Sequence, residues 1–148
     1  MSFDFSELSD FKKDILELAE NVYPKKTKKF LKNEAGKLAK VVKSNAQSEV
    51  GTSKGKKKDW EYKKSYLAGI KTGKVYKYDG ADCCRVRNSS PHGHLVDDGH
   101  IQKTKDGRTV GFVPGKHILK KAEMEFNNTF AADVEGFIDE VLNEGLNK

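Results

Sequence analysis

Segment 90–102, SPHGHLVDDGHIQ, contains three of the four histidines of this 148-residue chain and two adjacent aspartates. His92, His94 and His100, together with Asp97 or Asp98, are side chains of the kind that bind zinc or a harder cation. On a strand the first two histidines would point to the same face, but the glycine between them makes the segment pliable. The two aspartates would point apart on regular structure. Because a metal site needs both ligand number and geometry, we expect a structural turn, with a metal site as the alternative.

The other motif-like segments do not favour catalysis. Segment 111–117, GFVPGKH, has one residue too few between its glycines for a Walker A loop, and it ends in histidine where a hydroxyl residue is needed. Cys83 and Cys84 are adjacent, and we expect reduced thiols because a bond between neighbouring cysteines is strained. We therefore expect neither enzymatic activity nor a bound cofactor.

The composition predicts one folded domain whose charge is unevenly distributed. Hydrophobic residues make up 36% of the chain and charged residues 34%, with a net charge of +6. Residues 25–43 contain eight lysines and one glutamate, whereas the residues after Ala122 contain seven acidic side chains and one lysine. Such an asymmetry favours electrostatic contact with nucleic acid or protein. The alternative is that these charges only keep helix faces hydrated.

Nucleic-acid binding is one function that this charge pattern allows. The lysines would neutralise phosphates without reading sequence, which gives a salt-sensitive affinity, and Trp60, Tyr62 and Tyr66 offer rings for stacking on bases. The lysine-rich segment lacks arginine, however, which is the preferred residue for bidentate contacts with bases. The alternation of the aromatic residues also fits the core of a sheet.

Periodicity predicts two helices in the first third of the chain. Apolar residues recur at steps of three and four over residues 8–22 and again over 31–42, where the lysines fall largely on the other faces. Pro24 is expected to end the first helix and to start the second. Residues 47–59 are rich in glycine, serine and lysine and lack periodicity, so they are predicted to form a mobile basic loop.

Short strands and one long helix are predicted in the rest of the chain. Asp-Gly pairs at residues 79–80 and 106–107 predict tight turns, the second at the tip of a hairpin. Pro114 is expected to break the last strand, and apolar residues at steps of three and four predict a helix over 119–141. The strands are predicted from alternating residues over 60–70, 75–78, 81–88, 100–105 and 109–113.

This order of elements predicts an α+β fold. It comprises two N-terminal helices, a small antiparallel sheet of about four strands, and a long C-terminal helix packed on that sheet. Residues 1–148 are expected to form a single domain, and we find no apolar run long enough to span a membrane.

The ordered string PHGHLVDDGH, a charged glycine-containing hairpin, VGFVPGKH and a long last helix together resemble the small tail-component family of tailed phages and prophages. Proteins of that family act in head–tail joining or tail completion. The family pattern pairs a strand that ends in asparagine with a Pro/His/Leu/acidic/Gly-His turn, and a Pro-Gly-Lys-His element then leads into the last helix. The matching residues are Asn88, Pro91, His92, His94, Leu95, Val96, Asp97, Gly99, His100, Pro114, Gly115, Lys116 and His117.

The resemblance implies a structural virion protein of the neck or tail top, made in the bacterial cytoplasm. It implies a ring, hexameric when assembled, that contacts neighbouring neck or tail-tube proteins. A ring needs heterologous interfaces, and from the charges we expect a basic second helix to face an acidic last helix. The alternatives are a basic nucleic-acid-binding protein that contacts DNA non-specifically during packaging, and a small metal-binding protein. The expected assembly surface consists of Lys29, Lys32, Lys40, Glu135 and Asp139.

Overall fold

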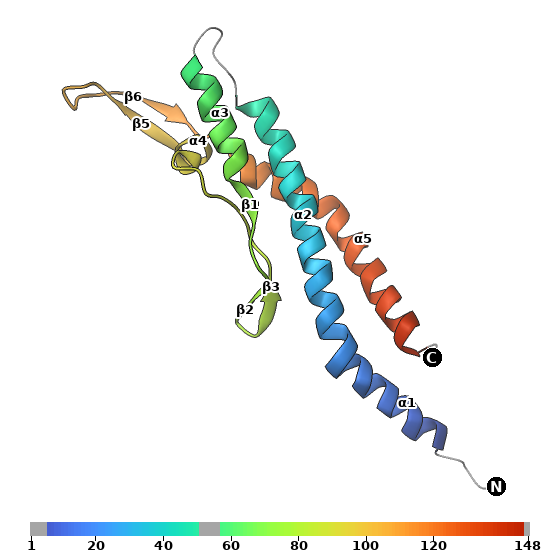
Figure 1. The fold of residues 1–148 in the computed structure, drawn as a ribbon. Helices are drawn as coiled ribbons and strands as arrows, with labels where there is room; N and C mark the ends of the chain where they lie inside the picture. Colours follow the sequence, from blue (N-terminus) through green and yellow to red (C-terminus); the bar gives the residue numbers. More distant parts are fainter. Residues whose placement is uncertain (1–5, 51–56, 147–148) are drawn as a thin grey trace.

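The computed structural model describes residues 6–50 and 57–146 and shows an elongated α+β molecule (Figure 1). Among the described helices, none combines the length and the apolar character that crossing a bilayer requires. The helical elements are α1 (Ser6–Glu17), the π-helical segment η1 (Leu18–Val22), α2 (Tyr23–Glu49), α3 (Lys57–Gly69), α4 (Gly93–Asp98) and α5 (Ile118–Leu146). The strands are β1 (Ile70–Thr72), β2 (Tyr76–Tyr78), β3 (Ala81–Cys83), β4 (Val86–Asn88), β5 (Gly99–Lys103) and β6 (Thr109–Pro114).

The elements α1, η1 and α2 follow one another without a break, unlike the two separated helices predicted. Pro24 lies in the first turn of α2, where a proline is tolerated because the N–H it lacks would lie at a helix start. The preceding turn is π-helical, and the Tyr23 N–H donates to the Leu18 carbonyl five residues earlier. The sequence therefore placed Pro24 correctly at the start of a helix, but the predicted interruption before it was wrong.

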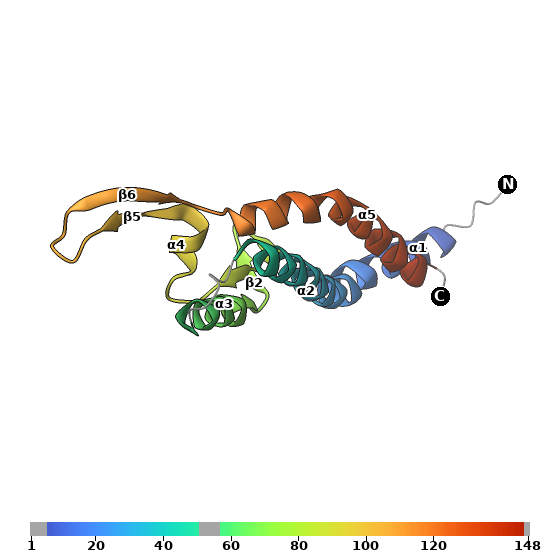
Figure 2. The same ribbon diagram turned by 90° about the horizontal axis from the view of Figure 1, so that it is seen from above.

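The long helices α2 and α5 lie side by side, as both views show (Figures 1 and 2). Phe30 of α2 stacks on Phe137 of α5, with ring centroids 4.4 Å apart. Lys37 bonds Glu34 of its own helix at 2.7 Å and Asp133 of α5 at 2.9 Å. The basic second helix and the acidic last helix thus neutralise part of each other's charge within one chain.

The hydrophobic core lies where α2, α3, β1 and the first turns of α5 meet. Ile118 and Val42 are its largest fully buried side chains. Tyr66 from α3 and Ile70 from β1 belong to the same cluster. Ala46, on α2, has a small side chain that leaves room for these residues to pack against the helix. The core therefore holds the start of α5 against the C-terminal half of α2.

The six strands form two-stranded antiparallel ribbons instead of one sheet. In the first, β1 pairs with β4 and β2 with β3, and the chain turns at Asp79 and Gly80, whose φ angles are 48° and 77°. Two successive positive φ angles are typical of the type I′ turn that an Asp-Gly pair predicts. In the second ribbon β5 pairs with β6, Ile101 lies opposite Phe112, and a bulge follows Gln102.

Residues 60–69 form a helix, so the strand predicted there was wrong. Lys64 interrupts the alternating pattern, whereas Tyr66 and Ile70 stand four residues apart. Both are 3% exposed, and that spacing lets the end of α3 and the start of β1 bury them against the same core. The helix α5 packs on α2 and not on a sheet, because no sheet forms that could cover its apolar face.

The predicted basic loop over 47–59 was wrong at both of its ends. Residues 47–49 belong to α2 and residues 57–59 to α3, and the stretch between them includes residues 51–56, which lie outside the described residues. Cys83 and Cys84 are free thiols, as predicted.

Candidate functional site

The segment that carries the family pattern connects the two ribbons and begins at Asn88, the last residue of β4. The Asn88 side chain donates from Nδ2 to the Tyr66 carbonyl at 3.2 Å, and its Oδ1 accepts from the Ser90 N–H at 2.9 Å. Gly93 packs so closely that an added Cβ would lie 3.1 Å from the Asn88 Cγ. Asn88 therefore fixes the end of β4 to helix α3.

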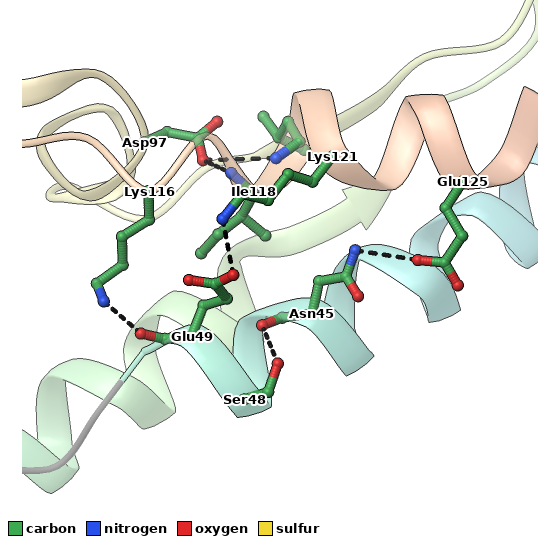
Figure 3. Close-up of polar contacts among 9 residues, drawn as sticks. Asn45, Ser48, Glu49, Asp97, Lys116, Ile118, Lys121 and Glu125 are labelled. Atoms are coloured by element: carbon green, nitrogen blue, oxygen red, sulfur yellow. Dashed lines mark hydrogen bonds and ion pairs between the residues drawn. The ribbon is translucent and has the colours of Figure 1, made fainter.

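Asp97, in the last turn of α4, caps the N-terminus of α5. Its Oδ1 accepts hydrogen bonds from the backbone N–H groups of Ile118 at 2.6 Å and Leu119 at 3.4 Å (Figure 3). These N–H groups have no partner within the helix, and the carboxylate lies at the positive end of the helix dipole. The acidic position of the turn thus stabilises a helix that begins 21 residues later.

Backbone contacts join the turn to the Pro-Gly-Lys-His element, residues 114–117. The Lys116 N–H donates to the Val96 carbonyl at 2.8 Å, and the His117 N–H donates to the Asp97 carbonyl at 3.1 Å. His117 takes a positive φ of 50°, which directs the chain into α5. A Cβ on Gly115 would collide with the backbone of the turn. The two parts of the family pattern therefore form one structural unit at the start of α5.

Replacing Asp97 with alanine is expected to lower the free energy of unfolding by about 1–2 kcal/mol, because the two N–H groups at the start of α5 lose their acceptor. Asp97→Asn keeps an oxygen acceptor without the charge and should lose about 0.5 kcal/mol. Urea unfolding followed by circular dichroism measures both. The control is Asp98→Ala at the exposed neighbour, which should change stability by less than about 0.5 kcal/mol. Equal losses at the two positions would contradict the capping role.

The histidines of the turn do not gather into a metal-binding group. In the described part of the chain, no three His, Cys, Asp or Glu side chains lie together as ligands for a cation. His92 and His94 are exposed, whereas the Nδ1 atom of His100 is buried and has no hydrogen-bond partner among the described residues. Asp97 uses its carboxylate to cap α5. The remaining residues of the pattern are Pro91 before α4, Leu95 within it and Pro114 at the end of β6.

A second set of contacts holds the start of α5 against the end of α2 (Figure 3). The Lys121 Nζ lies 2.7 Å from the Glu49 Oε1, and this hydrogen bond holds the pKa of the Glu49 carboxyl below its ordinary value. Lys116 donates to the Glu49 carbonyl at 2.5 Å, where the helix terminus carries a partial negative charge. The turn, the Pro-Gly-Lys-His element and the end of α2 therefore form a common base.

From this base the β5–β6 hairpin extends away from the helices (Figure 2). Ile101, Val110 and Phe112 are 58%, 62% and 63% exposed. Ile101 lies opposite Phe112, so these two side chains share one face of the ribbon. Val110 is the extra residue at the bulge beside them, between Thr109 and Gly111. A two-stranded ribbon is marginally stable on its own in water, and an exposed apolar face of this kind is typical of a binding surface.

The five residues expected to form an assembly surface are all exposed, and none of them forms an ion pair within the described residues. The pairs between α2 and α5 use other charges: Lys26 bonds Glu140 at 3.6 Å and also contacts Glu144. The complementary charge of these helices is therefore partly satisfied inside the chain. Lys29, Lys32 and Lys40 on α2 and Glu135 and Asp139 on α5 are among the exposed charges that these pairs leave unused.

The apolar face of the hairpin is the functional feature that sequence reasoning missed. The alternation in TVGFV predicted the strand correctly, but alternation alone does not show whether the apolar face meets a core or a partner. The sequence held no signal for this exposure, because it predicted one sheet with further strands that would have covered the face.

Comparisons of the chain with protein-family models, curated proteins and solved structures found no match in any of the three.

Proposed function

We propose that this chain is a structural virion protein of the phage neck or tail top, which completes the tail and joins it to the head. It acts as a ring, hexameric when assembled, in contact with neighbouring neck or tail-tube proteins. The observation that carries this proposal is the amount of surface that a single chain leaves exposed, and the order of residues in the turn supports the family assignment.

The solvent-accessible surface of the chain is 11388 Å². A compact monomer of 16.6 kDa exposes about 7,600 Å². If every residue outside the described segments were fully exposed, at about 160 Å² each, an excess of about 1,700 Å² would still remain. Stable homomeric interfaces bury about 2,000–5,000 Å² over both partners. Contacts with neighbouring subunits of a ring would bury an area of this size on each subunit.

Groups of three large exposed aliphatic or phenylalanine side chains occur at three places in the described part of the chain, which supports the same conclusion. The hairpin is one of them, and the other two lie near the opposite end of the molecule (Figure 1). Faces of this kind on a monomer mark interaction surfaces. Those on α1 are Phe11, Ile15 and Leu16, and those near the end of α5 are Ile138, Leu142 and Leu146.

Deleting the gene from the phage or prophage that encodes it should leave heads and tails that do not join, or tails of abnormal length. Electron microscopy of the lysate and a plaque assay measure this result. The intact gene supplied in trans should restore infectious particles, which controls for effects on neighbouring genes. Normal infectious particles without the protein would remove the proposed function.

A second candidate function, nucleic-acid binding, is favoured by one specific cavity. Gly73, Lys74, Tyr76, Arg85 and Arg87 of the first ribbon line a shallow cavity of about 330 Å³, with no carboxylate among them. The Arg85 guanidinium lies 5.6 Å from the centre of the Tyr76 ring, which orients it by a cation–π contact. Phosphate contacts are therefore expected at these arginines, because part of the lysine charge of α2 already meets α5.

The double substitution Arg85→Ala/Arg87→Ala tests this candidate. If both arginines contact phosphates, the slope of log K against log [NaCl] for a mixed-sequence DNA duplex should become shallower by about 2. Fluorescence anisotropy over a series of salt concentrations measures the slope. Lys32→Ala/Lys40→Ala removes the same charge from α2 and is the matched control. Equal changes in both variants would show that only net charge matters, and no binding at low salt would exclude the candidate.

A further inference from the structure

The β5–β6 hairpin carries one half of an interface. Its apolar surface consists of Ile101 and Phe112, which lie opposite each other, and of Val110 at the neighbouring bulge, each more than half exposed. The tip carries three cationic side chains and one carboxylate, that of Asp106, so its net charge is positive. None of the three cations forms an ion pair within the described residues. The hairpin therefore presents an apolar face beside a positively charged tip. The three cations are Lys103, Lys105 and Arg108.

The C-terminal half of α5 carries a complementary surface. Ile138, Leu142 and Leu146 are 43%, 42% and 40% exposed, and they recur at steps of four, so they share one helix face. Glu135 stands three residues before Ile138 and Asp139 three residues before Leu142, so both acids fall on the same face. Both are exposed and take no part in the ion pairs between α5 and α2. We call these five residues the acidic–apolar stripe.

The hairpin and the acidic–apolar stripe lie at opposite ends of the elongated molecule. Both views place the hairpin beyond one end of the helices and the C-terminal end of α5 at the other (Figures 1 and 2). One chain therefore does not bring its own hairpin onto its own stripe. A contact between two different patches on two copies is heterologous, and it closes into a ring when the rotation between copies allows it.

We propose that the hairpin of one copy docks on the acidic–apolar stripe of the next copy. The apolar face of the hairpin then covers the apolar side chains of the stripe, and the basic tip meets Glu135 and Asp139. This inference rests on the proposed ring assembly and names the surfaces through which the ring forms. A second copy is the occupant because one chain carries both halves of the contact. The excess surface of about 1,700 Å² also suffices for two patches of about 800 Å² each, the size that one partner buries in a standard interface.

Charge reversal on each side tests the contact and controls for folding at the same time. The hairpin variant is Lys103→Glu/Lys105→Glu, and the stripe variant is Glu135→Lys/Asp139→Lys. Each alone should self-associate at least about tenfold more weakly than the wild type, measured by sedimentation velocity at physiological ionic strength. An equimolar mixture should recover association, because each reversed patch then meets a reversed partner and each native patch meets a native one.

The matched control, Lys32→Glu/Lys40→Glu, reverses two exposed lysines of α2 and should leave self-association unchanged. If this control abolishes association and the stripe variant restores it, the α2 lysines are the partners of the stripe, and the docking of the hairpin is overturned. A mixture of the hairpin and stripe variants that fails to associate would also overturn it.

Zero-length cross-linking detects the contact even if the association is weak. A carbodiimide applied to mixed isotopically light and heavy copies should join Lys103 or Lys105 of one copy to Glu135 or Asp139 of another. No mixed-isotope product, or products confined to other residues, would overturn the docking. The proposed ring function is tested separately. Infectious particles formed without the gene would contradict that function, and they would not affect the result on the docking of the hairpin.

Discussion

Replacing Gly99 with alanine is expected to lower the free energy of unfolding by about 3 kcal/mol. Gly99 starts β5 with a φ of +85°, a conformation that costs an L side chain about 1–2 kcal/mol. An added Cβ would also lie 2.5 Å from the Val113 carbonyl oxygen and 2.7 Å from the Gly115 nitrogen. These are backbone atoms that cannot rotate away, so the overpacking adds about 1–3 kcal/mol.

Gly107 at the tip of the same hairpin provides the matched control. Its φ is +82°, but no atom would lie within 4 Å of an added Cβ. Gly107→Ala should therefore lose only about 1 kcal/mol, from the backbone conformation. Because 1 kcal/mol corresponds to about 3 °C for a chain of this size, thermal unfolding should show a loss of about 10 °C for Gly99→Ala and about 3 °C for Gly107→Ala. Equal shifts would mean that the contact with the Pro-Gly-Lys-His element contributes nothing.

Tyr66 is expected to destabilise the folded protein at high pH by about 2 kcal/mol. Burial of its ring, together with the nearby negative charge of Asp97, raises the pKa of the Tyr66 hydroxyl to about 12. In the unfolded chain the same group has a pKa of about 10. Between these values the unfolded chain loses the proton and the folded chain keeps it, so the stability present below pH 10 falls as the pH rises toward 12.

Tyr66→Phe should remove this part of the pH dependence. The Tyr66 hydroxyl is buried and makes no hydrogen bond of good geometry within the described part of the chain, so its loss should leave stability at pH 7 unchanged or slightly higher. Above pH 10 the variant should become progressively more stable than the wild type, as measured by urea unfolding over a series of pH values. The control is Tyr78→Phe, because Tyr78 is 71% exposed and its profile should parallel that of the wild type. Parallel profiles for all three proteins would contradict the raised pKa.

The sequence predicted correctly those elements whose conformation depends on residues close together along the chain. The Asp-Gly turn at 79–80 and the hairpin around 106–107 form as expected, with positive φ angles at Asp79 and Gly80 in the first and at Gly107 in the second. The last strand ends at Pro114, and the last helix follows from its apolar spacing. The strand over 60–70 was wrong because a short alternating run does not by itself distinguish strand from helix, and packing of Tyr66 against α2 decided the outcome.

The roles of the turn residues were only partly predictable. The sequence favoured a structural turn over a metal site on the grounds of Gly93 and the diverging aspartates. It did not identify the task of Asp97, because the N–H groups that Asp97 caps lie 21 residues further along the chain. Likewise, the charges of α2 and α5 suggested pairing between subunits, and part of that pairing, as at Lys37 and Asp133, occurs within one chain.

By itself, then, the sequence determined the α+β class, the turns, the long last helix and the uneven distribution of charge, since these depend on side-chain type and on neighbours a few residues away. Only the tertiary structure decided that Asp97 meets the start of α5, that α5 lies on α2, and that the hairpin extends away from the core. Such contacts depend on the path of the chain, because distant segments meet only when burial of a shared core offsets the entropy lost in ordering the chain between them. That path also leaves Ile101 and Phe112 uncovered, on the surface that we propose meets the next copy.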